Sequence, residues 1–298
     1  MNPLRLDGFD MGQVSQELSN RLTAAVERMP AFPKSVQRIL ELTRDINCSP
    51  KELVAVIETD PVIAIKILKI VNSAYFSLPS KISSINQSVV YLGLNTLKNL
   101  ALNFSTIGML PRQNAAGFDM QGYLLHSLLT AGLTRSLSER FAGNEADPTD
   151  AYTVGLLHNF GKVVFAQFMP QEFRQALALS AADGIPLHHA EERIIGADHA
   201  LVGAMLARHW QFSNSLAECI AGHHHGSGDG ALAECLHVAD LIAEQLSSEP
   251  VVAVEEIDSE EELPPRFGGG LGHVVAAVRD LDDMIEKANV FCHAEAFK

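Results

Sequence analysis

Helix start signals recur along this chain and favour a fold built from helices alone. Residues 49–52, Ser-Pro-Lys-Glu, have the pattern of a capping box with proline at the first helical position. An aspartate before a proline opens residues 60–61, ahead of an apolar helix to about Tyr75, and residues 147–150, ahead of a helix over residues 151–158. No run of alternating apolar and polar residues is long enough for a sheet. The sequence therefore predicts an all-α protein.

Turn-forming residues divide the chain into parts. A polar stretch at residues 111–117 carries proline and glycine and separates two helical blocks. Three further residues predict helix starts: Asn95 for residues 96–109, Asp119 for a helix to about residue 141, and Asn214 for a helix to the region of His223. We predict an N-terminal extension (1–24), an N-terminal helical subdomain (25–112), a second helical subdomain (113–246), and an acidic linker with a C-terminal helix (247–298), the helix covering about 273–289.

Composition and charge exclude several classes of protein. The 298 residues are enough for one large domain or two modest ones. The formal net charge of -14 argues against a nucleic-acid binder, which neutralises phosphates with a basic surface. The four cysteines are scattered without a C-x-x-C pair, as expected for reduced thiols. Because residues 1–12 lack a signal-peptide profile and no apolar run reaches 18 residues, we expect a cytoplasmic protein without a membrane segment.

Histidines and one aspartate lie on successive expected helices in an order that suggests a metal site. A single histidine on a helix is more often a core or surface residue, and His188, His189, His209, His225, His273 and His293 are interpreted in that way. The remaining histidines and the aspartate differ from these, because each of them ends or interrupts an apolar stretch, where a buried polar group needs a partner. Imidazole and carboxylate together suit iron, manganese, zinc or nickel. The candidate ligands are His126, His158, His199, His223, His224 and Asp240.

The order and context of these residues resemble the HD superfamily of phosphohydrolases in its HD-GYP branch, and more closely the HD-related output domain, HDOD. The resemblance rests on five motifs: residues 30–33, residues 60–61 with the helix that ends at residues 71–76, residues 82–94, Gly-Leu-Leu-His-Asn-Phe-Gly-Lys at 155–162, and residues 196–210. The similarity covers about residues 25–246. It implies an HD-like helical bundle with a packed N-terminal helical subdomain. It also implies a role in bacterial signal transduction, because the family is usually regarded as an output or scaffold module.

Two departures from the catalytic pattern shape the functional prediction. Asn159 stands where catalytic relatives carry a metal-bridging aspartate, and residues 225–230 replace their glutamate and Gly-Tyr-Pro segment. An amide can offer an oxygen to a cation but no charge, and the lost attraction is several kcal/mol on a rough Coulomb estimate. With Asn159 counted among the ligands, we expect partial occupancy or one divalent ion, and no efficient phosphodiester hydrolysis. Lys162 is either a phosphate contact or a surface lysine at a helix start.

The leading functional hypothesis is a noncatalytic regulatory module that binds a signalling protein or a ligand and transmits a conformational change. The alternative is a metal-dependent phosphohydrolase acting on a nucleotide or cyclic dinucleotide, in which Asn159 is a tolerated ligand. A third hypothesis is a redox or gas sensor with a single iron. A receiver domain is not supported, since the chain lacks alternating strands and helices. The sequence names no partner and leaves the oligomeric state open.

Overall fold

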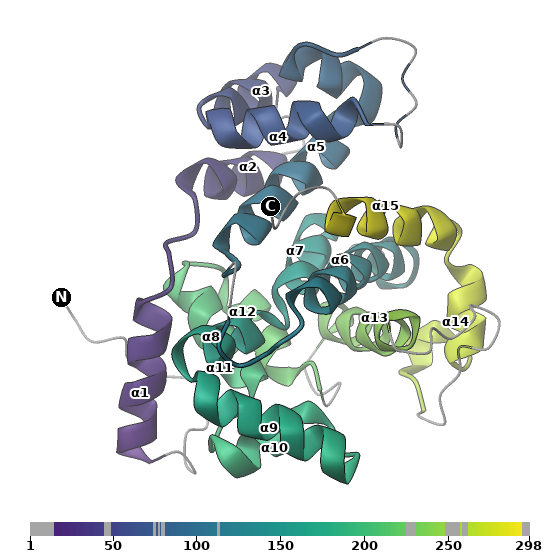
Figure 1. The fold of residues 1–298 in the computed structure, drawn as a ribbon. Helices are drawn as coiled ribbons and strands as arrows, with labels where there is room; N and C mark the ends of the chain where they lie inside the picture. Colours follow the sequence, from purple (N-terminus) through teal and green to yellow (C-terminus); the bar gives the residue numbers. More distant parts are fainter. Residues whose placement is uncertain are drawn as a thin grey trace.

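The structure is a computed structural model that describes residues 15–44, 49–73, 76, 78, 81–111, 114–224, 230–247, 257 and 262–293. Helices are the only regular secondary structure in these ranges, and no strand forms there (Figure 1). The all-α prediction is confirmed. No helix in the same ranges combines the length and the apolar character that crossing a bilayer requires.

Helices α2 to α5 form a unit at the top of Figure 1, whereas α1 lies apart from them. Helix α1 packs on α8 (Phe160–Phe168) and α11 (His199–His209) of the lower bundle. Trp210 of the bundle secures the connection between α1 and α2. Its indole nitrogen donates to the carbonyl of Pro30 (3.0 Å), and its ring packs on Phe32 with the ring centroids 5.2 Å apart. The five helices are α1 (Gln16–Glu27), α2 (Lys34–Arg44), α3 (Pro50–Glu58), α4 (Pro61–Val71) and α5 (Ile85–Met109).

Local capping explains where α3 and α4 begin and where α4 ends. Ser49 accepts from the backbone N–H of Lys51, and Asp60 accepts from that of Ile63, so both predicted starts are confirmed. The end of α4 was predicted at about Tyr75, but the helix ends at Val71. The side chain of Asn72 donates to a carbonyl of the last turn and accepts from the backbone N–H of Ile82 (2.7 Å), which turns the chain away.

Helix α5 is longer than predicted and contains a kink. It begins after Ser84 rather than at Thr96, and its backbone leaves helical geometry at Gly93, with φ 77° and ψ 166°. Only glycine adopts this conformation without strain. The predicted start therefore lies just beyond the kink, and the segment before it extends the same helix.

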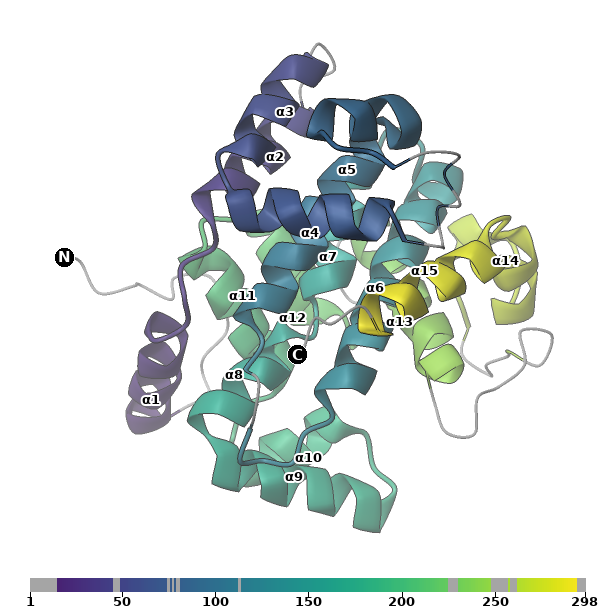
Figure 2. The ribbon, with the colours of Figure 1, turned by 45° about the horizontal axis from the view of Figure 1, so that its top comes forward.

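The lower helices form the bundle that carries the candidate ligands (Figure 2). The predicted helix after Asp119 is confirmed: Asp119 accepts from the backbone N–H of Gln121, and α6 passes into a π-helical turn. The start of α12 differs by one residue, because Ser213 and not Asn214 caps it. The elements are α6 (Met120–Leu137), the π-helical turn (Ser138–Ala142), α7 (Pro148–Leu157), α8 (Phe160–Phe168), α9 (Pro170–Asp183), α10 (Leu187–Ile194), α11 (His199–His209), α12 (Asn214–Gly222) and α13 (Ala231–Ser247).

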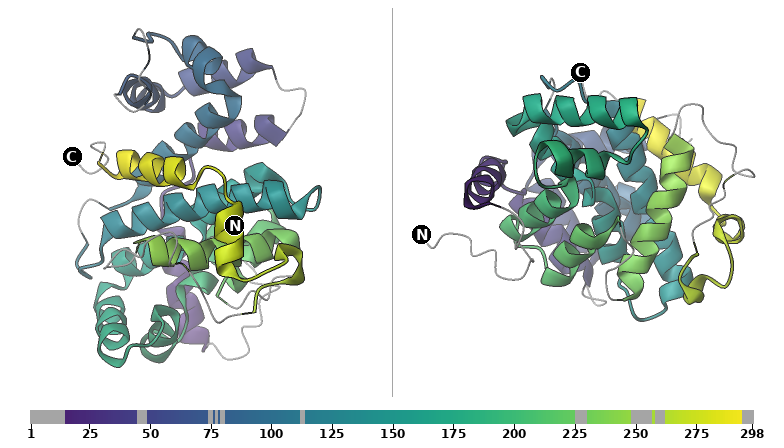
Figure 3. Two further views of the ribbon diagram at one scale, coloured as in Figure 1. Left: turned by 90° about the vertical axis from the view of Figure 1, so that its right-hand side faces the viewer. Right: turned by 90° about the horizontal axis from the view of Figure 1, so that it is seen from below.

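The C-terminal part contains two helices where one was predicted. Helix α14 (Leu271–Ala277) is followed by Val278, whose extended backbone (ψ 108°) redirects the chain into α15 (Leu281–His293). Helix α15 packs along α6 on the side that faces α4 and α5 (Figure 3). The short 3₁₀-helix Pro265–Phe267 precedes α14. Most of the predicted acidic linker lies outside the described residues.

The predicted four-part division remains a prediction. Helix α1 crosses the expected boundary between residues 24 and 25, and the loop between α5 and α6 coincides with the predicted seam at residues 111–117. The bundle places all the candidate ligands at helix ends or on inward faces, and this arrangement creates the site described next.

Candidate metal centre

Five elements of the bundle bring the six candidate ligands together. His126 lies in the middle of α6, Asp240 lies in α13, and His158 follows the last residue of α7. His199 is the first residue of α11, and His223 follows α12, with His224 directly after it. His158, His199 and His223 are buried, whereas His126, His224 and Asp240 are partly exposed.

Two glycines allow the close helix packing that this convergence needs. At Gly155 of α7, a Cβ atom would lie 2.7 Å from the Cα of Ala131 in α6. At Gly161 of α8, a Cβ atom would lie 2.0 Å from the carbonyl oxygen of His199. The glycines of the Gly-Leu-Leu-His-Asn-Phe-Gly motif therefore set the distances from α7 to α6 and from α8 to α11.

The first group of ligands joins α6, α7 and α13. Oδ1 of Asp240 lies 2.9 Å from Nε2 of His126 and 3.0 Å from Nε2 of His158, and the two imidazole nitrogens are 3.3 Å apart. The candidate ligand atoms of the group lie within 4.8 Å of one another. Three groups that ordinarily ligate metals thus converge on one point.

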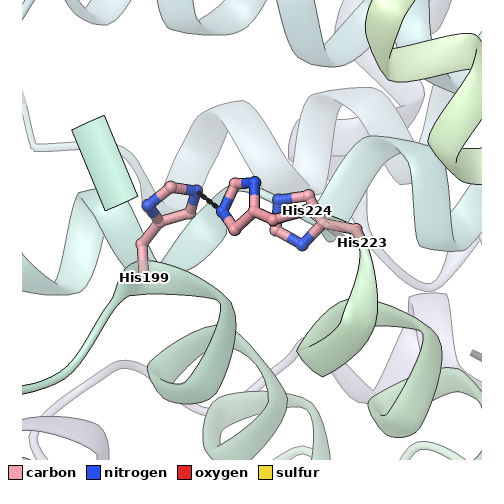
Figure 4. A group of neighbouring side chains, drawn as sticks. All are labelled: His199, His223 and His224. Carbon is pink, nitrogen blue, oxygen red and sulfur yellow. Dashed lines mark hydrogen bonds between the residues drawn. The ribbon is translucent and has the colours of Figure 1, made fainter. Parts of the chain in front are cut away.

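The second group joins α11 and the end of α12. Nε2 of His199 lies 3.0 Å from Nε2 of His224, and the rings of His223 and His224 pack with centroids 3.8 Å apart (Figure 4). The ligand atoms of His199, His223 and His224 also lie within 4.8 Å of one another. The ring centroids of His158 and His223 are 5.0 Å apart, so the two groups are neighbours.

The buried histidines are oriented by hydrogen bonds at Nδ1. The Nδ1 atoms of His158 and His223 lie 2.7 Å from the carbonyls of Gly155 and Ile220, and a carbonyl can only accept, so each Nδ1 carries the proton. Each Nε2 then presents a lone pair to the cluster. No described residue donates to Nε2 of His223. Such anchoring of the distal nitrogen is typical of histidines that bind metals.

The pKa values of these groups favour neutral imidazoles. Burial lowers the pKa of His223 to about 3 and also lowers the pKa values of His158 and His199. Burial alone would raise the pKa of Asp240, but its electrostatic interactions and hydrogen bonds with His158 and His126 hold it well below its usual range. Neutral imidazoles beside an ionised carboxylate are the protonation states that metal binding requires. The residues present therefore fit a divalent transition metal.

Asn159 lies buried beside the cluster, before the first residue of α8. Its Oδ1 atom is buried, and no described residue donates to it. Leaving such an oxygen without a partner costs about 1–3 kcal/mol. The oxygen can serve a cation, but it brings no negative charge.

A cavity of about 320 Å³ opens onto the centre. Its lining includes Asn159, Lys162, His126, His224 and Asp240. Burial lowers the pKa of Lys162, while nearby carboxylates act in the opposite direction. The lysine is thus positioned in the same cavity as the candidate ligands.

Sequence reasoning missed Glu191 and underrated His188, both on α10. Oε2 of Glu191 accepts from the backbone N–H of His199 and lies 2.6 Å from its Nδ1. Burial raises the pKa of Glu191 to about 8, although Lys162 and the backbone N–H of His199 act in the opposite direction. The imidazole of His188 stacks on that of His224 with centroids 4.1 Å apart. A signal for Glu191 exists, since it occupies a position on the apolar stripe of its helix.

Comparisons with known proteins give the family match and one curated relative. The model of the HDOD domain family matches residues 29–226. A protein of Treponema pallidum (strain Nichols), described as uncharacterized, is 28% identical over 213 residues, which are 70% of this chain and 41% of that protein. The chain thus spans about two fifths of the length of this curated relative.

Several solved structures share the fold. An HDOD domain protein of unknown function from Geobacter sulfurreducens is 23% identical, with a TM-score of 0.71 over 91% of this chain and 98% of that chain. A candidate phosphohydrolase from Shewanella amazonensis SB2B is 25% identical, with a TM-score of 0.64 over 93% of this chain and 96% of that chain. A candidate signal transduction protein from Marinobacter aquaeolei VT8 is 21% identical, with a TM-score of 0.71 over 92% of this chain and 65% of that chain.

Proposed function

The chain belongs to the HDOD domain family, which is related to the HD metal-dependent phosphohydrolases, and from this premise we propose that it is a noncatalytic bacterial signalling module. In this role the degenerate metal site holds the bundle in one conformation, and the protein acts by binding a signalling partner or a ligand. The observation that carries the proposal is the buried Asn159, whose oxygen has no donor among the described residues and whose neutral side chain lines the same cavity as members of both ligand groups.

The charge of the ligands limits how many divalent ions the site can hold. Asp240 is the one carboxylate among the six candidate ligands, so two divalent ions would bring four positive charges against one negative charge. Two dications about 4 Å apart in a site of this kind repel strongly, and a bridging carboxylate offsets part of that repulsion. A single ion leaves a much smaller uncompensated charge. The site therefore favours one ion over two.

The group that contains Asp240 is the better location for that ion. His126, His158 and Asp240 offer two neutral imidazoles and one carboxylate, whereas the second group offers three imidazoles and no charge. A bound transition metal supplies a Lewis acid and a cross-link. The three residues themselves belong to α6, α7 and α13, so holding a common ligand would fix these helices relative to one another.

A phosphohydrolase is the second candidate function. All six histidine and carboxylate ligands expected from the resemblance converge, and Lys162 lines the adjoining cavity, where it could contact a phosphate. In this alternative the amide oxygen of Asn159 replaces the bridging carboxylate, and the substrate is a nucleotide or cyclic dinucleotide.

Metal content and turnover, measured on the same preparations, discriminate between the two functions. The protein is purified without chelator or histidine tag, its metals are quantified, and hydrolysis of cyclic di-GMP and simple nucleotides is followed. Asn159→Asp is compared with Asn86→Asp, which makes the same chemical change at an exposed position of α5. We expect at most one metal equivalent and negligible turnover in the starting protein and in Asn86→Asp, and higher metal content in Asn159→Asp.

Two bound metal equivalents with rapid turnover in the starting protein would refute the noncatalytic function. A partner captured from a bacterial lysate whose binding survives Asn159→Asp but not removal of the metal would support a role of the metal in shaping the docking surface.

A further inference from the structure

A second cavity, of about 310 Å³, lies where α5, α6, α7 and α15 meet. None of the six candidate metal ligands lines it. Its size falls at the lower end of the range for small-molecule sites, which also tend to form between packed units. Helix α15 closes one side and lies outside the residues matched by the family model.

Two carboxamides of α5 face this cavity. Asn99 and Asn103 are four residues apart, on the same face of the helix, and both line the cavity. Asn103 is buried, and its Oδ1 accepts from the hydroxyl of Tyr152 (2.9 Å), which fixes the orientation of the amide. Oδ1 of Asn99 is buried, and no described residue donates to it. The cavity thus presents an acceptor that requires an N–H or O–H donor.

The remaining lining combines apolar surface with compensated charge. Leu100, Leu128, Met284 and Phe291 supply apolar and aromatic contacts from α5, α6 and α15. The charged side chains of the lining include two ion pairs, Arg135 with Glu139 (2.8 Å) and Lys287 with Asp283 (2.5 Å). Asp280 adds one further acceptor. A strongly anionic ligand is therefore disfavoured, and a neutral ligand with N–H donors is favoured.

We propose that this cavity binds a neutral, planar nitrogen heterocycle, held by hydrogen bonds to the carboxamides of Asn99 and Asn103 and by contact with the side chain of Phe291. A carboxamide offers a donor and an acceptor in one plane, which matches the edge of an aminopurine. The ligand would bridge α5, α6 and α15 and so stabilise the packing of the N-terminal unit and the C-terminal helix on the bundle. This inference does not depend on the proposed function of the metal centre.

The test uses the full chain and adenine as the probe, with binding measured by isothermal titration calorimetry. Asn99→Leu removes the acceptor, and Asn86→Leu makes the same change at an exposed position of the same helix. Ser136→Phe narrows the cavity from α6 and leaves both carboxamides in place. Naphthalene, as a second probe, tests whether an apolar bicyclic ring of similar shape suffices. Circular dichroism verifies that each variant is folded.

We expect adenine to bind the starting protein and Asn86→Leu equally. It should bind Asn99→Leu about tenfold or more weakly, as the loss of one hydrogen bond to a buried group implies. It should bind Ser136→Phe about tenfold or more weakly because the added ring fills part of the cavity. Three results would overturn the proposal: no binding of adenine at millimolar concentration, equal binding to all four proteins, or binding of naphthalene as tight as that of adenine. If Asn99→Leu fails to fold, Ser136→Phe alone decides the outcome.

Discussion

Gly161→Ala perturbs the contact that brings α8 against α11. A Cβ atom at this position would lie 2.0 Å from the carbonyl oxygen of His199, 2.8 Å from its carbonyl carbon and 2.9 Å from the backbone nitrogen of Gly203. All three are backbone atoms at or near the start of α11, so no side chain can rotate away. The two helices must separate, and His199 must move with α11.

The expected loss of stability follows from the steric overlap between the added Cβ atom and the backbone of α11. Ordinary contacts of a Cβ atom begin at 3.4 Å, so a separation of 2.0 Å requires a backbone shift of more than 1 Å. Overpacking of a rigid interior costs about 1–3 kcal/mol and sometimes more, whereas the higher helix propensity of alanine returns at most about 1 kcal/mol. We expect the free energy of unfolding to fall by about 2 kcal/mol or more.

The assay is equilibrium unfolding by urea, followed by circular dichroism, on protein freed of metal. Gly108→Ala is the matched control, because Gly108 is also helical and no atom lies within 4 Å of its added Cβ. We expect this control to keep or slightly raise the free energy of unfolding. If the two variants unfold at the same urea concentration, the steric account of the Gly-Leu-Leu-His-Asn-Phe-Gly motif is wrong.

Three further predictions concern charge. Because burial lowers the folded pKa of His223 to about 3, below its ordinary 6.5, the unfolded metal-free chain takes up this proton first as the pH falls. As the pH falls below 6.5, this one imidazole should therefore lower the free energy of unfolding by up to about 1.4 kcal/mol per pH unit. The free energy of unfolding of metal-free protein, measured as a function of pH, would contradict this prediction if it rose on acidification. Glu191→Gln should leave the affinity for the one bound ion nearly unchanged, as should Glu192→Gln at the exposed neighbouring position, because Glu191 orients His199, which belongs to the group without Asp240. Calorimetric metal titration measures both, and a loss of affinity of about 10- to 100-fold in Glu191→Gln alone would place the ion at His199 instead. Arg266→Ala should lower the free energy of unfolding by about 1–3 kcal/mol, because the Arg266 guanidinium forms ion pairs with both Glu234 and Glu145. Arg38→Ala, at an exposed position, should lower it by about 0.5 kcal/mol or less. Similar urea midpoints for the two variants would contradict this prediction.

Much of the fold could be predicted because helix starts are local events. A capping side chain satisfies N–H groups two or three residues away, so Ser49, Asp60 and Asp119 mark their helices without knowledge of the rest of the chain. Helix ends depended on distant partners. The end of α4 is set by the bond between Asn72 and Ile82, and the division of the C-terminal helix at Val278 has no comparable local signal.

For the candidate site, too, the sequence predicts local features and leaves contacts between distant residues open. The order of the histidines and the position of Asn159 indicate the candidate ligands, but the pattern does not say which atoms share a centre. Folding places His126 and Asp240 in one group and His199 and His224 in another. Glu191 escaped notice because its role is defined by contact with His199, eight residues away on a different helix.

The sequence by itself determined that this protein is helical, which side chains are of a type that can ligate a metal, and that position 159 carries an amide rather than a carboxylate. These are properties of residue types and of short-range hydrogen bonds. Only the tertiary structure decided how the ligands divide into two groups, which carboxylate supports His199, and that α15 closes a cavity lined by Asn99. Distances between helices depend on the packing of side chains that are far apart in the chain, and Gly155 and Gly161 have their effect only through the backbones that they meet.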